Sequence, residues 1–324
     1  MTLAPAEPIG RLAWDPWGRC VVGAALDGSL WSVARDGDVE ALGPGAAPVT
    51  ALDWAPDGSD LAVGSLDGHL RIGPPGDPPR LTMRFRGSVG TLAWSPDATA
   101  LAIGAGSDVV VIDADGGLID EFCFLPGAVQ SLCWAPGPGN LAAGCVGGIH
   151  WLDVGGEGPA EPVVIDQRAG AVTTLRLDPR RRFLAVGDLR GAVEVIDLWG
   201  GVTSIIDDLP DRVRRLVWSP DSDRLAVAVD DMVVVWPRDH EGLGPDAEVA
   251  ITHDDLVSDA DLHPGGKWLA SAGLDGCVAV TDLDTGNRQR TVNTAEPVRS
   301  VAWSPDGELL AFGSTSRGII LVGL

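Results

Sequence analysis

One short phrase recurs eight times along the chain: an apolar residue, a spacer, Trp or Leu, a second spacer and then Pro. It reads LAWDP at Leu12–Pro16, LDWAP at Leu52–Pro56 and LAWSP at Leu92–Pro96. The eight phrases end at Pro16, Pro56, Pro96, Pro136, Pro179, Pro220, Pro264 and Pro305, so that successive prolines lie 40 to 44 residues apart. A repeat of this period is typical of the four-stranded blades of a β-propeller.

Each repeat contains the signals of four short strands. In the second repeat, VTALDWA alternates as a strand does, and the turn that follows has Pro56 to preset φ and Gly58 to accept a positive φ. DLAVGSL, HLRI and RLTMRF then predict three more strands, and Asp67-Gly68 between the first two of these is a hairpin signal. The repeat unit is therefore predicted to be one antiparallel sheet.

A sheet that is apolar on both faces cannot bury them alone, whereas radial stacking of sheets does so and protects their edges. The sequence therefore predicts an all-β fold: a single closed eight-bladed β-propeller with four antiparallel strands per blade, as one domain over residues 1–324. The last repeat lacks a fourth strand, while TLAPAEPIGRLAW at the start of the chain aligns with TVNTAEPVRSVAW from Thr291. Residues 2–8 are thus expected to complete the blade formed by residues 297–324.

The Trp or Leu of the repeated phrase is expected to form a structural core between blades. An aromatic ring of this size buries ~150–250 Å² when it packs in a core. The eight residues at this position are Trp14, Trp54, Trp94, Trp134, Leu177, Trp218, Leu262 and Trp303.

The repeats resemble those of the WD-repeat propeller family across essentially the whole chain. WSPDG at Trp303–Gly307 and LASAGLDGCVAVTD at Leu269–Asp282 are closest to its consensus. The resemblance implies a hydrogen-bonded brace within the seventh blade, formed by His253, Ser271 and Asp275, although Thr281 stands where Trp is usual. Most other repeats lack both the His and the terminal Trp, so the chain resembles a divergent, bacterial-type member.

The resemblance also implies a function. Members of the family are commonly rigid, non-enzymatic scaffolds or assembly platforms, and we expect a protein or peptide partner. The resemblance points to the face that carries the hairpin turns between second and third strands. The residues expected on this face are Asp27, Asp67, Arg190, Arg212, Asp230, Asp231 and Arg317.

Composition restricts the kind of partner and the compartment. The formal net charge of −23 disfavours nucleic acid, because an acidic surface repels phosphate. No apolar run approaches the ~20 residues that span a bilayer, and the N-terminus does not read as a secretion signal. Five cysteines form an odd set without a close pair and are expected to be small buried thiols. We therefore expect a cytoplasmic, monomeric protein that does not bind membranes.

No catalytic, cofactor-binding or metal-binding residue is predicted. The sequence contains no phosphate loop, zinc spacing or nucleophile elbow. The loop at 237–248 gathers acidic residues and His240, and is interpreted as a solvated loop, with a hard-cation site as the alternative. The alternative function is a propeller enzyme, hydrolytic or metal-assisted, with a site at the mouth of the central channel. The residues expected there are Arg11, Ala51, Thr91, Ser131, Thr174, Arg215, Asp259 and Ser300.

Overall fold

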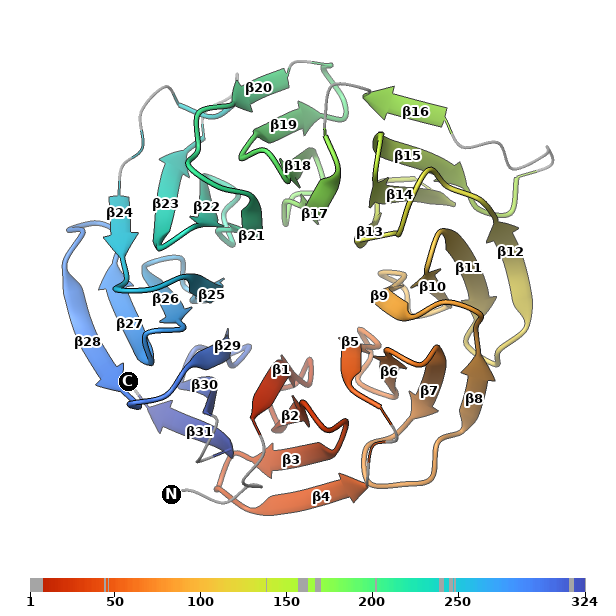
Figure 1. Cartoon of the computed structure of the whole chain (residues 1–324), viewed down its shortest axis with the longest axis horizontal. Coiled ribbons are helices and arrows are strands. Elements are labelled where there is room, and N and C mark those ends of the chain that lie inside the picture. Colours follow the sequence, from red (N-terminus) through yellow and green to blue (C-terminus); the bar gives the residue numbers. More distant parts are fainter. Residues whose placement is uncertain are drawn as a thin grey trace. The chain divides into compact units, whose positions relative to one another are not determined.

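The computed structural model of the chain describes residues 8–43, 45, 47–137, 139–156, 163–166, 170–201, 203–238, 242–244, 247, 249–314 and 318–323 (Figure 1). The described residues form strands, turns and irregular segments. No helix occurs among them, and so none that could cross a membrane.

The first half of the chain forms sixteen strands. They are β1 (Ile9–Trp14), β2 (Cys20–Ala25), β3 (Leu30–Ala34), β4 (Val39–Gly43), β5 (Val49–Trp54), β6 (Leu61–Ser65), β7 (His69–Gly73), β8 (Leu81–Arg84), β9 (Val89–Trp94), β10 (Ala100–Ala105), β11 (Asp108–Asp113), β12 (Leu118–Phe122), β13 (Ser131–Trp134), β14 (Asn140–Cys145), β15 (Gly148–Asp153) and β16 (Val163–Asp166).

The second half continues the pattern with fifteen strands. They are β17 (Val172–Leu177), β18 (Phe183–Asp188), β19 (Val193–Asp197), β20 (Thr203–Ile206), β21 (Val213–Trp218), β22 (Arg224–Val229), β23 (Met232–Pro237), β24 (Val249–Thr252), β25 (Val257–Leu262), β26 (Trp268–Gly273), β27 (Cys277–Asp282), β28 (Arg288–Asn293), β29 (Val298–Trp303), β30 (Leu309–Ser314) and β31 (Gly318–Gly323).

The strands form eight sheets, each from strands that are consecutive in the chain. Seven sheets have four strands, and the eighth has three described strands, β29, β30 and β31. The recorded pairings are antiparallel, as in β10 with β11, where Ala102 lies opposite Val111. The predicted repeat unit is therefore confirmed. The fourth strand expected at residues 2–8 lies outside the described residues, apart from Pro8.

Contacts divide the chain into two compact units. One, called the larger unit below, comprises residues 1–14 and 176–324, and the other comprises residues 15–175. Each is described below by its own contacts. The single domain over residues 1–324 stays a prediction.

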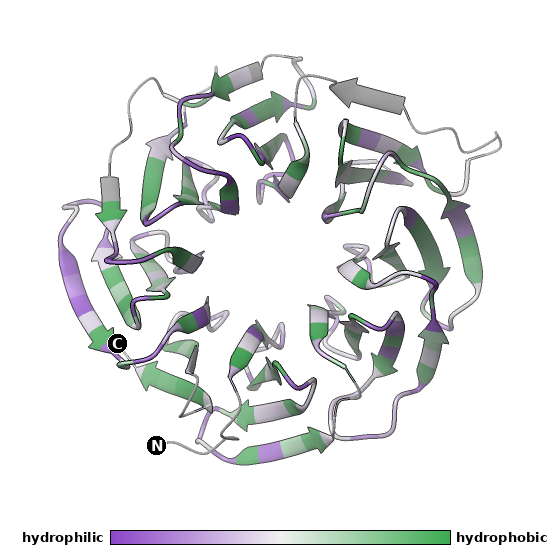
Figure 2. Ribbon diagram, viewed as in Figure 1, coloured by the Kyte–Doolittle hydropathy of each residue, from purple (hydrophilic) through white to green (hydrophobic). Residues whose placement is uncertain are grey.

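In the first, second, third and seventh sheets, burial falls from the second strand to the fourth. All six residues of β10 are buried, and so are all six of β18. The fourth strand is more exposed: five of the six residues of β28 are exposed, and the strand is hydrophilic along most of its length (Figure 2). The apolar second strands thus form the core, as expected for sheets that are covered on both faces.

A glycine late in the second strand allows the first strand of the following sheet to approach closely. An added Cβ on Gly144 would lie 2.5 Å from Val172 Cγ1, and one on Gly64 would lie 2.4 Å from Val89 Cγ1. A contact under 3.0 Å cannot be accommodated without movement. These positions therefore require glycine for packing between sheets.

The same contact joins the first strand to the last sheet within the larger unit. An added Cβ on Gly313 of β30 would lie 2.8 Å from Ile9 Cβ of β1. Ile9 is buried. The start of the described chain therefore packs on its last sheet as β9 packs on the second sheet and β17 on the fourth.

Four of the repeat tryptophans donate hydrogen bonds to the preceding sheet. Trp94 Nε1 donates to the carbonyl of Asp53 at 3.2 Å, and Trp134 Nε1 donates to that of Ala93 at 2.9 Å. Trp218 Nε1 and Trp14 Nε1 donate to the carbonyls of Arg176 and Ala302, both at 3.0 Å. The acceptor is always the residue just before the repeat Trp or Leu of the preceding sheet. Six of the eight repeat residues are buried, while Trp134 and Leu177 are half-buried.

Candidate functional site

The residues of the implied brace lie together in the seventh sheet. His253 Nε2 is 2.8 Å from Ser271 Oγ, and His253 Nδ1 is 3.1 Å from Asp275 Oδ2. Asp275 also accepts hydrogen bonds from the backbone N–H groups of Asp254 and Cys277. Thr281 is fully buried. These contacts fasten the turn before β27 to the segment after β24.

Cys277 joins this group, which the search for zinc spacing missed. The ligand atoms of His253, Asp275 and Cys277 lie within 4.8 Å of one another. No motif in the sequence marks this group, because His253 lies 22 positions before Asp275 and 24 positions before Cys277. Because the Asp275 carboxylate already accepts hydrogen bonds from His253 and two backbone groups, we interpret the group as structural.

The position proposed for a catalytic site holds an ion pair in the larger unit. Arg215 Nε lies 3.2 Å from Asp259 Oδ1. Asp259 Oδ2 accepts hydrogen bonds from Ser300 Oγ at 3.0 Å and from the Val301 N–H at 3.1 Å. Burial and the nearby Arg215 lower the pKa of Arg11. Asp259 thus ties β21, β25 and β29 together.

Asp261, two residues further along β25 than Asp259, has a carboxyl group with a raised pKa. Burial raises the pKa of its carboxyl to about 6, against the opposing effect of a hydrogen bond from the Trp303 N–H at 2.8 Å. The folded protein therefore holds a proton on Asp261 that the unfolded chain releases between about pH 4 and pH 6. This group contributes stability at low pH that is lost as the pH rises through that window.

We expect the variant Asp261→Asn to lack this dependence. The unfolding free energy of the wild-type protein, minus that of Asp261→Asn, should fall by ~2–3 kcal/mol between pH 4 and pH 7. Urea titrations at closely spaced pH values measure the difference. The fully exposed Asp115, changed to Asn, is the control and should leave the curve parallel to wild type. A pH-independent difference for Asp261→Asn would contradict the assignment.

The residues predicted for a partner-binding face lie in turns, where several act on the turn itself. Asp27 accepts hydrogen bonds from the N–H and Oγ of Ser29. Asp67 accepts from Ser65 Oγ and pairs with His69 Nδ1 at 2.8 Å, and these hydrogen bonds lower its pKa to about 2. The remaining described residues are Arg190 between β18 and β19, Arg212 between β20 and β21, and Asp230 and Asp231 between β22 and β23. Arg317 lies outside the described residues.

Apolar side chains stand beside these turn residues, and the sequence analysis missed them. Leu26 and Leu66 precede Asp27 and Asp67 and are 44% and 56% exposed. Val146, at the same place in the fourth sheet, is 50% exposed. The sequence feature that could have indicated their exposure is an apolar residue that follows the end of a strand pattern and directly precedes a Gly-containing turn.

The most exposed of the large apolar residues recorded on the surface is Phe124, after β12. Its side chain is 89% exposed, and its φ of 65° is rare for an aromatic residue. The neighbouring Cys123 is also exposed, so the expectation of a buried thiol is wrong there. The cause is that β12 ends at Phe122 and the chain then crosses the surface.

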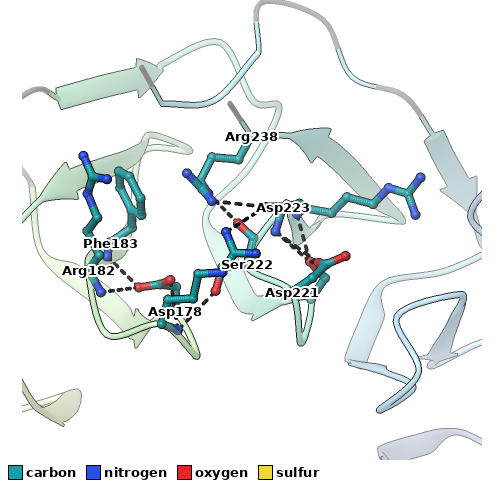
Figure 3. Close-up of polar contacts among 10 residues, drawn as sticks. Asp178, Arg182, Phe183, Asp221, Ser222, Asp223 and Arg238 are labelled. Atoms are coloured by element: carbon teal, nitrogen blue, oxygen red, sulfur yellow. Dashed lines mark hydrogen bonds and ion pairs between the residues drawn. The ribbon is translucent and has the colours of Figure 1, made fainter. Parts of the chain in front are cut away.

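A second candidate surface lies in the larger unit, around the turns after β17, β19 and β21. Arg182 makes two hydrogen bonds to Asp197, at 2.6 and 3.1 Å, which lower the pKa of Asp197 to about 2. Arg182 and Arg238 both lie against the ring of Phe183, at 4.9 and 4.3 Å from its centroid (Figure 3). Trp199 beside them is 71% exposed.

The arginines of this surface are neutralised by aspartates. Arg238 Nη2 lies 3.2 Å from Asp223 Oδ1 (Figure 3). Arg180 Nη1 lies 3.3 Å from the same oxygen. Asp178 is buried and accepts hydrogen bonds from the backbone of Arg182 and Phe183. The cluster therefore stabilises the turns. Because its arginines are paired with aspartates, the group that it presents to a partner is the Trp199 side chain and not a net positive charge. The acidic residues of the 237–248 loop, with His240, lie outside the described residues.

Comparison with known proteins gives the class. Three segments, residues 41–72, 248–282 and 286–321, match the family described as WD domain, G-beta repeat. The structure of Sqt1 from Chaetomium thermophilum, bound to the N-terminus of the ribosomal protein L10, superposes with a TM-score of 0.81 at 18% identity and covers 98% of this chain and 97% of that one. The fold is an eight-bladed β-propeller, as predicted.

Among curated proteins, the chain is 30% identical over 148 residues to the U3 small nucleolar RNA-associated protein 21 homolog of Schizosaccharomyces pombe, and 34% identical over 118 residues to the ribosome biogenesis protein BOP1 of Mus musculus. These matches cover 43% and 35% of this chain. They cover only 15% and 16% of the relatives, so the chain spans a small part of their length.

Proposed function

We propose that this protein is a non-enzymatic scaffold that binds a protein or peptide partner through its surface turns. The observation that carries the proposal is the exposure of large apolar side chains on turns anchored to a buried core. Phe124, Trp199 and Trp17 are 89%, 71% and 65% exposed. Aromatic side chains of this kind dominate the energy of many protein interfaces.

The comparisons support a binding role. The similar structure of Sqt1 contains the N-terminus of another protein, the ribosomal protein L10. The acidic surface, with a net charge of −23, favours a protein over a nucleic acid as partner. We further propose a bacterial-type, cytoplasmic protein that acts as a monomer with one domain.

The alternative of a propeller enzyme gains no specific support. At the expected position, Asp259 accepts hydrogen bonds from two groups and pairs with Arg215. A carboxylate with these partners fastens strands rather than serving as a free base.

Affinity capture from the native lysate, followed by mass spectrometry, tests the proposal. An unrelated protein of similar net charge is the control, because a −23 surface retains basic proteins non-specifically. We expect a protein that the control does not retain and that binds the purified propeller directly in calorimetry. Failure to recover any such protein would argue against a scaffold.

A further inference from the structure

Lysine and arginine are absent from the strands of the third and fourth sheets. Between Arg86 and Arg168 the sequence contains no Lys or Arg, and it contains ten Asp and Glu residues. The strands β9 to β16 lie within this stretch. Any surface built from these two sheets therefore carries negative charge that no lysine or arginine of its own neutralises.

Two apolar side chains are exposed at one end of these sheets. Phe124 lies on the connection from β12 to β13, and Val146 lies on the turn from β14 to β15. The connection packs on that turn, since an added Cβ on Gly127 would lie 2.8 Å from Val146 Cγ2. We call Cys123, Phe124 and Val146, with Asp108 and Glu121, the Phe124 surface.

The backbone holds Phe124 in place although its conformation is unfavourable. Its N–H donates to Asp108 Oδ1 at 3.0 Å, and the next N–H, of Leu125, donates to the carbonyl of Ser107 at 3.0 Å. The side chain of Leu125 is buried, whereas that of Phe124 is 89% exposed. A positive φ costs a bulky residue of order 1–3 kcal/mol, and such strain clusters at binding sites. The exposed position of the Phe124 ring is therefore maintained at a cost in stability.

Two carboxylates lie near the backbone N–H of Phe124 and the thiol of Cys123. Glu121 is exposed at the end of β12, and Asp108 is half-buried beside the Phe124 N–H. Burial raises the pKa of the Cys123 thiol, and the charges of Glu121 and Asp108 raise it further. Both carboxylates therefore lie close to Cys123. An apolar group with two uncompensated carboxylates fits a ligand that combines an apolar side chain with positive charge.

We propose that the Phe124 surface docks a basic segment of a partner protein, in which an aliphatic or aromatic side chain packs on Phe124 and Val146 while Lys or Arg faces Glu121 and Asp108. This rests on the proposed scaffold function and adds the class of partner. A second copy of this chain fits poorly, because its charge of −23 would repel the surface.

The test uses the full chain and a labelled peptide library in fluorescence anisotropy. The probes are 15-residue peptides with a Leu or Phe flanked by Lys and Arg, the same peptides with Glu for Lys and Arg, and basic peptides with Ser for the apolar residue. We expect the basic apolar peptides to bind at least tenfold more tightly than either other set. Their binding should weaken with salt, as steered ion pairs do.

Variants separate binding from stability. Phe124→Gly relieves the positive φ, so its melting temperature should equal or exceed that of wild type. It should nevertheless weaken binding tenfold or more, as Val146→Ser and Glu121→Lys should also do. Leu118→Ser and Asp115→Lys are matched controls, because Leu118 is 65% exposed and Asp115 fully exposed at the other end of β12. Both should bind as wild type.

The outcomes are distinct from those of affinity capture. Wild-type affinity in Phe124→Gly and Glu121→Lys, equal binding of acidic peptides, or no binding by any peptide would overturn the basic-partner assignment. If a captured partner is retained by Phe124→Gly, the scaffold function stands and this surface does not carry it. Self-association of the wild-type protein that Phe124→Gly abolishes, seen in sedimentation, would make a second copy the occupant and would also overturn the proposal.

Discussion

Replacement of Trp94 by alanine is expected to lower the free energy of unfolding by ~3–5 kcal/mol. The Trp94 side chain is 7% exposed and packs with Val89, Leu101 and Ile112 in one apolar cluster. Its Nε1 also donates to the carbonyl of Asp53 in the preceding sheet, at 3.2 Å. The variant therefore leaves a cavity and removes a bond between two sheets.

Urea unfolding followed by circular dichroism measures the change. Trp17→Ala is the control, because the Trp17 side chain is 65% exposed and should cost less than ~1 kcal/mol. Equal stability of Trp94→Ala and wild type would show that the repeat position does not form the core between sheets.

The second large effect is expected for Gly313→Ala, with a loss of ~1–3 kcal/mol from overpacking. The new methyl group would lie 2.8 Å from Ile9 Cβ and 3.0 Å from the Ile9 carbonyl oxygen. The backbone oxygen cannot move without shifting β1, so the clash would displace the first strand from the last sheet.

The control for Gly313→Ala is Gly90→Ala in β9. An added Cβ there meets only the Val129 carbonyl oxygen, at 3.5 Å, which is an ordinary contact. Gly90→Ala should be neutral or slightly stabilising, since alanine loses less backbone entropy than glycine. If the two variants unfold at the same urea concentration, β1 does not pack on β30.

The sequence predicted the fold because the same local signals recur eight times. Proline and glycine turns such as that at Pro56–Gly58 end strands at fixed intervals, and the apolar second strands demand cover on both faces. The brace of His253, Ser271 and Asp275 was reached through resemblance, because His253 lies 18 and 22 positions before its two partners in the chain.

The candidate surfaces were less accessible from the sequence. Asp27 and Asp67 were expected to face a partner, but their carboxylates bond within their own turns. Phe124 was not singled out, because its exposure depends on where β12 ends and on the Asp108 carboxylate that holds its N–H. Such features depend on contacts across strands, which periodicity does not encode.

The central structural claim is that the first strand packs on the last sheet, within the unit of residues 1–14 and 176–324. A double-mutant cycle of Ile9→Gly and Gly313→Ala tests it most directly, because glycine at position 9 removes the Cβ and Cγ2 atoms that lie 2.8 and 2.9 Å from the new methyl group. The account predicts that the double variant is more stable than the sum of the single losses by ~1 kcal/mol or more. Additive losses would show that Ile9 and Gly313 are not in contact and would contradict the account.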